Sequence, residues 1–380
     1  WIHCYHRSTQ YEKECVVMKS VITFGEIMGR IATRGHARFR QALPGEVVIT
    51  FAGAEANVAA SLAMLGQPVS FVTALPADSD IADACEGYLR NVGIDTSRIV
   101  RGDGRMGMYY VETGANQRPS KVTYDREGSA VACAGASAYD WESIISGADW
   151  FHFTGITPAI SAEAAAATLA ALDAARAAGL TVSCDLNFRK KLWRWEAGTS
   201  PKELAGRVMS ELLPLVDVLI ANEGDADDVL GIRAAGTDVE SGKLSIDQYP
   251  EVAREIVRRF PNISRVGITL RESMSADWNN WGAMLHDGER DESHFAPVQE
   301  GRYSPYPIRD IVDRVGAGDA FGAGLIHAMC SSNLADPDRA VQFAAAASCL
   351  AHSIEGDFNF STRDDIERLM AGSASGRVIR

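Results

Sequence analysis

Short apolar segments alternate with longer, alanine-rich segments along most of the 380-residue chain. The short segments have the length and the branched or aromatic residues of buried strands, and they cover 21–24, 69–74, 150–153, 181–184, 218–221 and 265–269. The longer segments have the length and composition of helices, and they cover 57–65, 162–178, 201–213, 249–259 and 320–329. Strands that alternate with helices form mainly parallel sheets covered on both faces, so the pattern predicts an α/β fold.

Some regions depart from this rhythm. Residues 30–51 and 106–124 hold β-type residues, glycines and prolines but no crossover helix, and we predict that they form a small antiparallel lid over a cleft. The polar stretch 233–248 predicts a surface insertion. Residues 1–17 lack an initiating Met and an apolar signal core, so we expect them to lie outside the fold, with Met18 as the natural start and one domain over 18–375.

The most informative segment for chemistry is Asp-Arg-Val-Gly-Ala-Gly-Asp-Ala-Phe-Gly-Ala-Gly at 313–324. Gly316 and Gly318 permit a tight turn without a Cβ, and the apolar run after it predicts a helix whose N-terminus binds an anion. A carboxylate such as Asp319 would compete with that anion. Its presence is explained if Asp319 takes a proton from an alcohol that attacks a bound phosphoryl group.

A dinucleotide site is the alternative for these glycines, but that site requires an early βαβ unit and an acid about 20 residues further on. The glycines lie near the C-terminus instead, with Asp319 directly after them. A nicotinamide-dependent oxidoreductase is therefore the weaker hypothesis.

Polar side chains near other predicted element ends extend the candidate site. Asn57 enters a helix after a glycine turn and could bind a polyol or simply cap that turn. Tyr124 and Arg126 share a strand face and suit a hydroxy-carboxylate, although an ordinary exposed strand face gives the same pattern. Asn187 and Arg189 follow a strand, where ligand crevices of open α/β sheets lie.

Asn222 and Asp225 also follow a strand, and they could organise a magnesium ion through water. Acids that cap the next helix are the alternative. The segment from Thr269 offers a polar backbone to a nucleotide, with tryptophans that would shield it.

Charge and cysteine content restrict the partners. A net charge of −13 argues against nucleic acid or an anionic membrane as partner, and no apolar run is long enough to span a membrane. The 7 cysteines are scattered without metal spacing, which is typical of a reducing, cytoplasmic location.

Taken in order, these motifs resemble the ribokinase-like (PfkB) sugar kinase family over about residues 20–370. The resemblance rests on Gly53-Ala-Glu-Ala-Asn57 and Asp313-Arg-Val-Gly-Ala-Gly-Asp319. Within the family, Gly25-Glu-Ile-Met-Gly-Arg30, Asp185-Leu-Asn-Phe-Arg189 and Gly356-Asp-Phe-Asn359 are similar to the branch that phosphorylates 2-keto-3-deoxygluconate.

The resemblance implies a ribokinase-like fold and the transfer of phosphate from ATP, with Mg²⁺, to the 6-hydroxyl group of a sugar acid. It also implies roles for named residues: Asp319 as base; Gly316, Ala317 and Gly318 as anion hole; Gly53, Ala54, Asn57, Tyr109, Tyr124, Arg126 and Asp357 on the sugar; Asn187, Arg189, Thr269, Arg271 and Asn359 on the nucleotide; Asn222 and Asp225 at the metal through water. A monovalent cation near Asp313 and a homo-oligomer are further expectations.

The chain departs from the family pattern at several points. Asp225 stands for the usual Glu, Leu75-Pro-Ala-Asp78 replaces a glycine-containing segment, and Arg30 lies near the place of a sugar-binding Asp. An Arg there fits an acidic substrate better than a neutral one. A kinase of fructose or ribose and a non-catalytic sugar-acid sensor stay open as alternatives.

Overall fold

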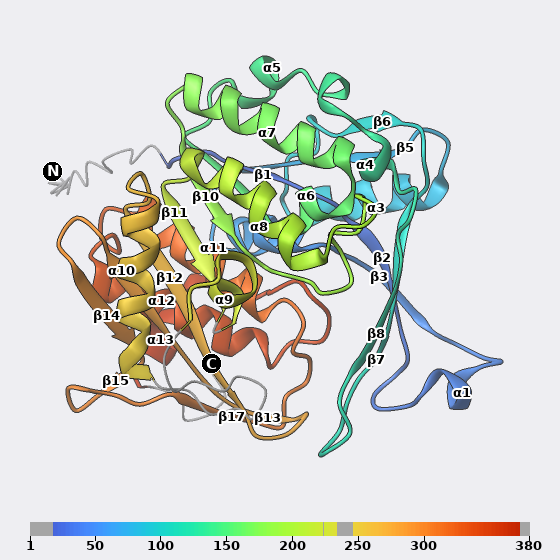
Figure 1. Cartoon of the computed structure of the whole chain (residues 1–380). Helices are drawn as coiled ribbons and strands as arrows, with labels where there is room; N and C mark the ends of the chain where they lie inside the picture. The colour runs from blue at the N-terminus through green and yellow to red at the C-terminus, as the bar shows by residue number, and fades with distance from the viewer. Residues whose placement is uncertain (1–17, 223, 234–245, 373–380) are drawn as a thin grey trace, which may run out of the picture.

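The computed structural model describes residues 18–222, 224–233 and 246–372 (Figure 1). The N-terminal segment 1–17 and most of the predicted insertion at 233–248 lie outside the described residues. The prediction of one domain over 18–375 stays a prediction.

A mainly parallel sheet forms the centre of the molecule. Its strands lie in the order β14-β13-β12-β11-β10-β9-β1-β4, and β17 pairs with β13. The pairs from β4 to β12 are parallel, and the pairs that β13 makes are antiparallel. The bounds are β1 Val21–Phe24, β4 Val69–Val72, β9 Trp150–Thr154, β10 Thr181–Asp185, β11 Val218–Ala221, β12 Arg265–Ser273, β13 Trp278–Asp287, β14 Glu292–Ala296 and β17 Tyr306–Arg309.

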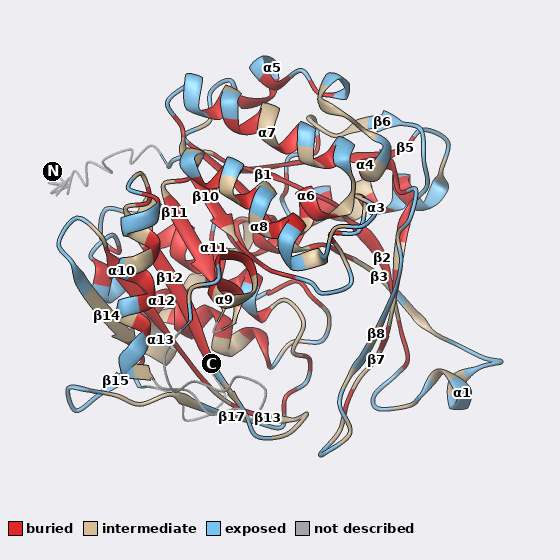
Figure 2. Cartoon of the chain, viewed as in Figure 1, coloured by how far each residue is buried: buried red, intermediate tan, exposed pale blue. Residues whose placement is uncertain are grey.

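Helices cover both faces of this sheet (Figures 1 and 2). On one face lie α5 Trp141–Ile145, α7 Ala162–Ala177, α8 Pro201–Leu212, α9 Asp225–Leu230 and α10 Tyr249–Arg259. On the other lie α2 Ala54–Met64, α3 Asp80–Asn91, α11 Ala317–Cys330, α12 Pro337–Ala351 and α13 Arg363–Met370. Shorter elements are α1 Phe39–Ala42, α4 Ala130–Cys133, α6 Ile156–Ile160, β5 Ala74–Pro76, β6 Val100–Gly102, β15 Val298–Gln299 and β16 Arg302–Tyr303.

The strands are buried on both sides because successive side chains point into different cores. In β11, Leu219 packs into the core under α7 and α8, whereas Val218 and Ile220 pack into the core under α2 and α11. Alternate burial of wholly apolar strands is what a doubly covered parallel sheet requires. The predicted fold class is confirmed.

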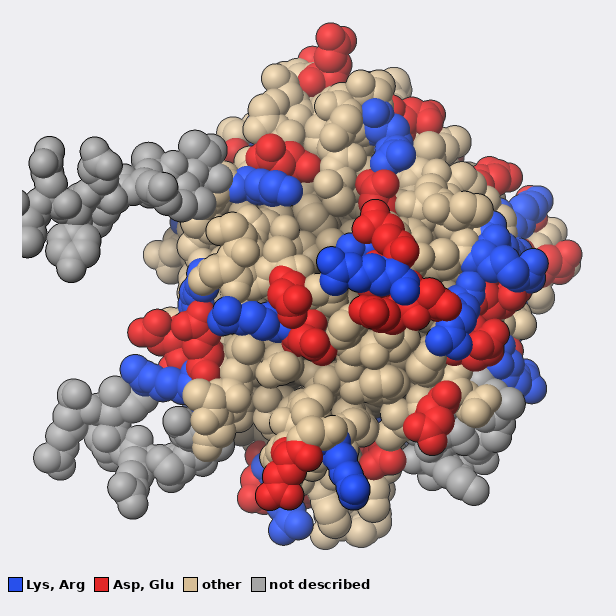
Figure 3. Space-filling view, turned by 90° about the vertical axis from the view of Figure 1, so that its left-hand side faces the viewer, with Lys and Arg blue, Asp and Glu red and all other residues tan. Residues whose placement is uncertain are grey.

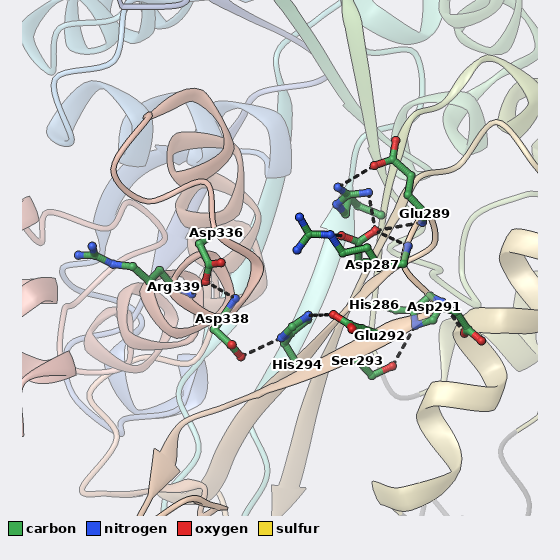
Figure 4. Close-up of polar contacts among 12 residues, drawn as sticks. His286, Asp287, Glu289, Asp291, Glu292, Ser293, His294, Asp336, Asp338 and Arg339 are labelled. Carbon is green, nitrogen blue, oxygen red and sulfur yellow. Dashed lines mark hydrogen bonds and ion pairs between the residues drawn. The ribbon is translucent and has the colours of Figure 1, made fainter.

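The segment from Thr269, which the sequence marked only as a polar backbone, forms two paired strands. β12 continues to Ser273, turns, and returns as β13 from Trp278, which pairs along its length with β12. The strand β13 is buried from Trp281 onward. Its polar first residues gave no indication of a buried strand, so the sequence analysis did not predict it. At the far end of β13 and β14, the Nδ1 atom of His294 lies 2.8 Å from Oδ1 of Asp338 at the start of α12 (Figure 4).

A separate four-stranded sheet projects from the body in the order β3-β2-β7-β8 (Figure 1). Its strands are β2 Met28–Ala32, β3 Val48–Ala52, β7 Gly107–Glu112 and β8 Lys121–Asp125. The small extra sheet was predicted, but its purely antiparallel pairing was wrong, because β2 and β7 pair in parallel. One segment leaves the body on β2 and returns on β3, and the other leaves on β7 and returns on β8. The strands β2 and β7 therefore run in the same direction.

The tip of the β7–β8 hairpin rests on the β12–β13 turn. The backbone N–H of Asn116 donates to Oδ2 of Asp277 at 3.2 Å, and the N–H of Ala276 donates to the carbonyl oxygen of Asn116 at 2.8 Å. The carbonyl oxygen of Ser275 in the same turn accepts a bond from Nη2 of Arg314 at 3.2 Å. The projecting sheet therefore contacts the body at its tip as well as at its base.

Both signs of charge are interspersed on the face of the molecule in Figure 3. Among the described helices, none combines the length and the apolar character needed to cross a bilayer.

Candidate active site

A cavity of about 440 Å³ lies at the carboxyl ends of the strands, between the sheet and the β2–β3–β7–β8 lid. Its lining includes nearly every residue that the sequence had singled out: Gly53, Ala54, Asn57, Tyr109, Tyr124, Arg126, Asn187, Arg189, Asn222, Thr269, Arg271, Gly316, Ala317, Gly318, Asp319 and Asp357. Asp225 and Asn359 are not part of that lining.

The glycine turn before α11 is formed by close backbone packing. Gly316 has φ 87°, and a Cβ on it would lie 2.1 Å from the carbonyl oxygen of Asp357. Only glycine satisfies both conditions. The turn leads directly into the first turn of a 14-residue helix, whose N–H groups lack intrahelical acceptors. Ala317 and Gly318 thus present N–H groups and the positive end of the helix dipole to the cavity.

Asp319 lies in that first helical turn and is 9% exposed. Its Oδ2 atom accepts a hydrogen bond of 2.6 Å from Nδ2 of Asn57. Burial raises the pKa of Asp319 to about 6, while Asn57 and Arg189 oppose the rise. A carboxyl with this pKa is mostly ionised at pH 7 and basic enough to accept a proton, which suits a general base.

Asn57 is held at both ends of its amide. Its Oδ1 atom accepts the N–H of Gly53 at 3.2 Å, and its Nδ2 atom donates to Asp319. Gly53 itself must lack a side chain, because a Cβ would lie 1.9 Å from the carbonyl oxygen of Glu26. Asn57 therefore satisfies its own turn and orients the candidate base at the same time.

On the lid side, aromatic and charged groups meet at one wall of the cavity. The hydroxyl of Tyr109 donates to Oδ2 of Asp357 at 2.7 Å. The guanidinium carbon of Arg126 lies 5.6 Å from the ring centroid of Tyr124. Burial raises the pKa of Asp357 to about 7, with Arg30 and Tyr109 acting against it.

Arg126 is not the exposed strand residue that its position in the sequence suggested. Its side chain is 10% exposed and forms an ion pair with Glu26, whose side chain is 2% exposed. Loss of Arg126 would leave the Glu26 carboxylate buried without its partner, so we expect it to destabilise the fold.

On the opposite side, Thr269 and Arg271 project from β12, and Asn187 and Arg189 lie just after β10. Asn359 is buried outside the cavity lining. Its amide nitrogen donates to the carbonyl oxygen of Ala347 at 3.4 Å, and its Oδ1 atom accepts the N–H of Ser361 at 3.0 Å. Its side chain thus serves the end of α12.

Asn222 and Asp225 form reciprocal contacts at the start of α9. The Oδ1 atom of Asn222 accepts the N–H groups of Gly224 and Asp225 at 2.8 and 3.1 Å, and Oδ2 of Asp225 accepts the N–H of Asn222 at 3.0 Å. This is the capping arrangement that was the alternative to a metal role. Among the residues that the structure describes, no group of three or more His, Cys, Asp or Glu side chains is placed to hold a metal ion unaided.

Several lining residues were not given a role by the sequence analysis: Glu26, Glu55, Asp185 and Arg314. Asp185 was quoted only as the first residue of the 185–189 motif, and its pKa lies well above the usual value because of burial and the nearby Asp225 and Asp319. Glu55 lies inside the glycine motif, where its acidic side chain among small residues was an available signal. Its Oε1 atom accepts three bonds, from the N–H and hydroxyl of Thr154 at 3.1 and 2.8 Å and the hydroxyl of Thr157 at 2.7 Å.

A buried carboxyl at a helix N-terminus, in a cavity between the central sheet and the β2–β3–β7–β8 sheet, is the arrangement expected of a phosphotransferase that acts on a small alcohol. The chain belongs to the pfkB family of carbohydrate kinases, whose model matches residues 18–257 and 287–362.

The relatives share most of their length with this chain. The 2-dehydro-3-deoxygalactonokinase of Haloferax volcanii is 32% identical over 357 residues, which cover 94% of this chain and 98% of the relative. The 2-dehydro-3-deoxygluconokinase of Thermoproteus tenax is 29% identical, with 92% and 94% covered. The crystal structure of a 2-dehydro-3-deoxygluconokinase from Thermotoga maritima is 44% identical with a TM-score of 0.83, covering 93% of this chain and 100% of the other.

Proposed function

We propose that this protein is an ATP-dependent sugar-acid kinase that phosphorylates the 6-hydroxyl group of 2-keto-3-deoxygluconate, also called 2-dehydro-3-deoxygluconate. The observation that carries the proposal is the position of Asp319, which is buried at the helix N-terminus, held by Asn57, and given a pKa of about 6. The names of the relatives supply the substrate class.

In the proposed reaction, ATP is the second substrate and supplies the γ-phosphoryl group. Asp319 accepts the proton of the sugar hydroxyl as its oxygen forms a bond to the γ-phosphorus, and the bond from that phosphorus to the bridging oxygen breaks to release ADP. The N–H groups at Gly316, Ala317 and Gly318 stabilise the charge on the transferred group. Arg189 opposes the rise in the pKa of Asp319, which supports a position near both reacting groups.

Mg²⁺ would neutralise charge on the ATP phosphates. The donor set fits a cation held mostly by phosphate and water, because burial together with Asp225 and Asp319 raises the pKa of Asp185, and a nearby cation would offset that repulsion. Asn222 lines the cavity and would act through water, with Asp225 behind it. Thr269, Arg271 and Asn187 would contact the nucleotide.

For the sugar acid, Tyr124 and Arg126 are the proposed carboxylate contacts, with Tyr109, Asp357, Gly53 and Ala54 around the hydroxyls. A neutral sugar such as fructose or ribose is the second candidate. The observation that favours it is the ion pair of Arg126 with Glu26, because that pair already balances the charge of the guanidinium.

A coupled assay of ADP formation with ATP, Mg²⁺ and a panel of sugars separates these hypotheses. The panel holds 2-keto-3-deoxygluconate, its galactonate epimer, fructose and ribose. A kcat/KM for the acids well above that for the neutral sugars is expected, and the reverse order would refute the proposal. Consumption of NAD(P)H without coupling enzymes would favour the oxidoreductase, and the absence of turnover with every sugar would favour the sensor.

The remaining expectations are also proposals. The Asp313 carboxylate, where a monovalent cation was expected, is paired with Arg30 and accepts the N–H groups of Arg314 and Val315. Titration of activity with K⁺, with Na⁺ as control, tests that cation. Location in the cytoplasm agrees with the free cysteines among the described residues, and sedimentation equilibrium tests the homo-oligomer.

A further inference from the structure

Arg30 is a charged side chain enclosed by protein. It lies in the middle of strand β2 of the lid and is 3% exposed. It is absent from the lining of the cavity of about 440 Å³ described above, which we call the sugar cavity. A buried guanidinium must be paired and hydrogen-bonded to be tolerated. Because it does not reach the cavity, any effect on the reaction must pass through its partners.

The partners of Arg30 belong to the two halves of the candidate active site. Its Nη2 atom pairs with Oδ2 of Asp313. Asp313 is the first residue of the segment 313–319, which contains the glycine turn before α11 and which we call the phosphate turn. Its Nε atom lies 3.2 Å from Oδ1 of Asp357, which lines the sugar cavity. One planar group on the lid thus joins the phosphate turn to a sugar-side carboxyl.

Each partner is in turn tied to the backbone or to the lid. Oδ1 of Asp313 accepts the N–H groups of Arg314 and Val315 at 2.8 and 3.2 Å, and Oδ2 accepts that of Gly356 at 3.3 Å. The other oxygen of Asp357 accepts the hydroxyl of Tyr109 at 2.7 Å. Without the Arg30 guanidinium, the turn that leads to Gly316 and the Asp357 carboxyl would each keep these bonds but would no longer be joined to one another.

We infer that Arg30 is a positioning residue of the phosphotransfer reaction, whose guanidinium holds the phosphate turn, through Asp313, in register with the sugar-binding carboxyl of Asp357. This inference rests on the proposed kinase function. Arg30 lies near the position where the family pattern has a sugar-binding Asp. In this chain it joins two carboxylates and does not contact the sugar.

The charges around Asp357 support this role. Arg30 from β2, Tyr109 from β7, Asp313 from the turn and Asp319 from α11 all face the carboxyl, and Arg30 is the cation among those that affect its pKa of about 7. Without Arg30, burial and the two neighbouring acids would favour the protonated carboxyl. A neutral Asp357 would present one acceptor oxygen fewer to a sugar hydroxyl.

A second cavity makes the inference testable by chemical rescue. It measures about 330 Å³, and Arg30, Asp313, His36, Asp277 and Glu355 contribute to its lining. In Arg30→Ala, guanidinium ions could reach the vacated position between Asp313 and Asp357 from this side.

The variants are Arg30→Ala, Arg30→Lys and the control Arg105→Ala. Arg105 forms an exposed ion pair with Asp125 beside the same sheet and does not line the sugar cavity. Folding of each is checked by thermal melting, and activity on the best wild-type substrate of the panel is measured from pH 5.5 to 9.

The expected loss of kcat/KM in Arg30→Ala at pH 7 is about 10- to 150-fold, the worth of one charge-assisted hydrogen bond. The acid limb of the pH profile of kcat/KM in Arg30→Ala should move upward by about one pH unit or more. The reason is that an adjacent cation lowers a carboxyl pKa by at least that amount, and Asp357 would lose this cation. Guanidinium should restore activity saturably in Arg30→Ala and in neither wild type nor Arg105→Ala. Lysine can reach one carboxylate only, so Arg30→Lys should have a kcat/KM between those of wild type and Arg30→Ala. The acid limb of its pH profile should stay close to that of wild type.

A folded Arg30→Ala with wild-type kcat/KM, an unmoved acid limb, or no response to guanidinium would overturn the inference. If Arg30→Ala does not fold, Arg30→Lys decides: a kcat/KM equal to wild type refutes the bridge, and a loss with an unmoved acid limb supports it. Inactivity of the wild type on every sugar would instead refute the proposed function.

Discussion

The Glu26–Arg126 ion pair allows a quantitative test of how the sugar side is built. The side chains of Glu26 and Arg126 are 2% and 10% exposed. Among the described residues, neither carboxylate oxygen of Glu26 has a hydrogen-bond partner, so the ion pair is what balances its charge. Arg126→Ala would leave a buried, uncompensated carboxylate.

Breaking a buried ion pair in this way costs about 3–5 kcal/mol, whereas replacing both partners with apolar residues is often neutral. We therefore expect Arg126→Ala to lower the free energy of unfolding by about 3 kcal/mol or more at pH 8, and Glu26→Leu/Arg126→Met to recover most of that loss. Urea denaturation followed by tryptophan fluorescence measures both.

The same variants test substrate class. Glu26→Gln leaves Arg126 free to meet a substrate carboxylate, so the KM for the sugar acid should fall or stay constant while the KM for a neutral sugar does not improve. A stability of Arg126→Ala within about 0.5 kcal/mol of wild type, as for a surface change, would refute the buried-pair reasoning. Equal losses of kcat/KM for acid and neutral sugars in Arg126→Met would refute its role in reading charge.

Four further predictions concern the candidate active site. Asp319→Asn should keep substrate binding, measured by calorimetry, and lower kcat by about 10²–10⁴, and a near-normal kcat would assign the base elsewhere. In wild type, kcat/KM should fall as pH drops below about 7, because Asp357 and then Asp319 take up protons. Glu55 has its pKa raised by burial from 4.5 to about 7, so its contribution to stability is complete below pH 4.5 and is lost as pH rises through 7. Glu55→Gln cannot ionise, so its melting temperature relative to wild type should rise between pH 5.5 and pH 8, and an equal difference at both pH values would contradict this. Gly316→Ala should lower both stability and kcat, because φ 87° and the 2.1 Å approach to the Asp357 carbonyl oxygen exclude a Cβ; unchanged melting would show that the turn relaxes.

The features that could be read from the sequence are those whose cause is local. The turn from Gly316 to Asp319 follows from glycines, an acid and an apolar helix within a few positions, and the strand starting at Val218 follows from a short apolar run. Such patterns constrain the backbone directly, so the element and its chemistry can be inferred together.

The features that could not be read depend on partners far along the chain. Arg30 meets Asp313 across 283 positions, and nothing beside Arg30 indicates that its charge is enclosed. The burial of Arg126 depends on Glu26 in the same way. Pairing direction is also non-local: the lid hairpins were recognisable, but the parallel register of β2 with β7 depends on how the body orients both segments. The polar start of β13 did not indicate a strand, because it is held in the sheet by pairing with β12 and β17 and not by an apolar sequence of its own.

The contact between the lid tip and the β12–β13 turn has a thermodynamic consequence. Asn116 of the lid bonds Asp277 and Ala276, and the neighbouring Ser275 bonds Arg314 beside the phosphate turn. A ligand that fixes the β2–β3–β7–β8 sheet would therefore also fix the turn that we propose binds the nucleotide, so each ligand should bind more tightly in the presence of the other. Reciprocity then requires the sugar to gain affinity from a non-hydrolysable ATP analogue by the same factor that the analogue gains from the sugar. The two substrates would be cooperative within a single chain, through two hydrogen bonds at the tip of a sheet.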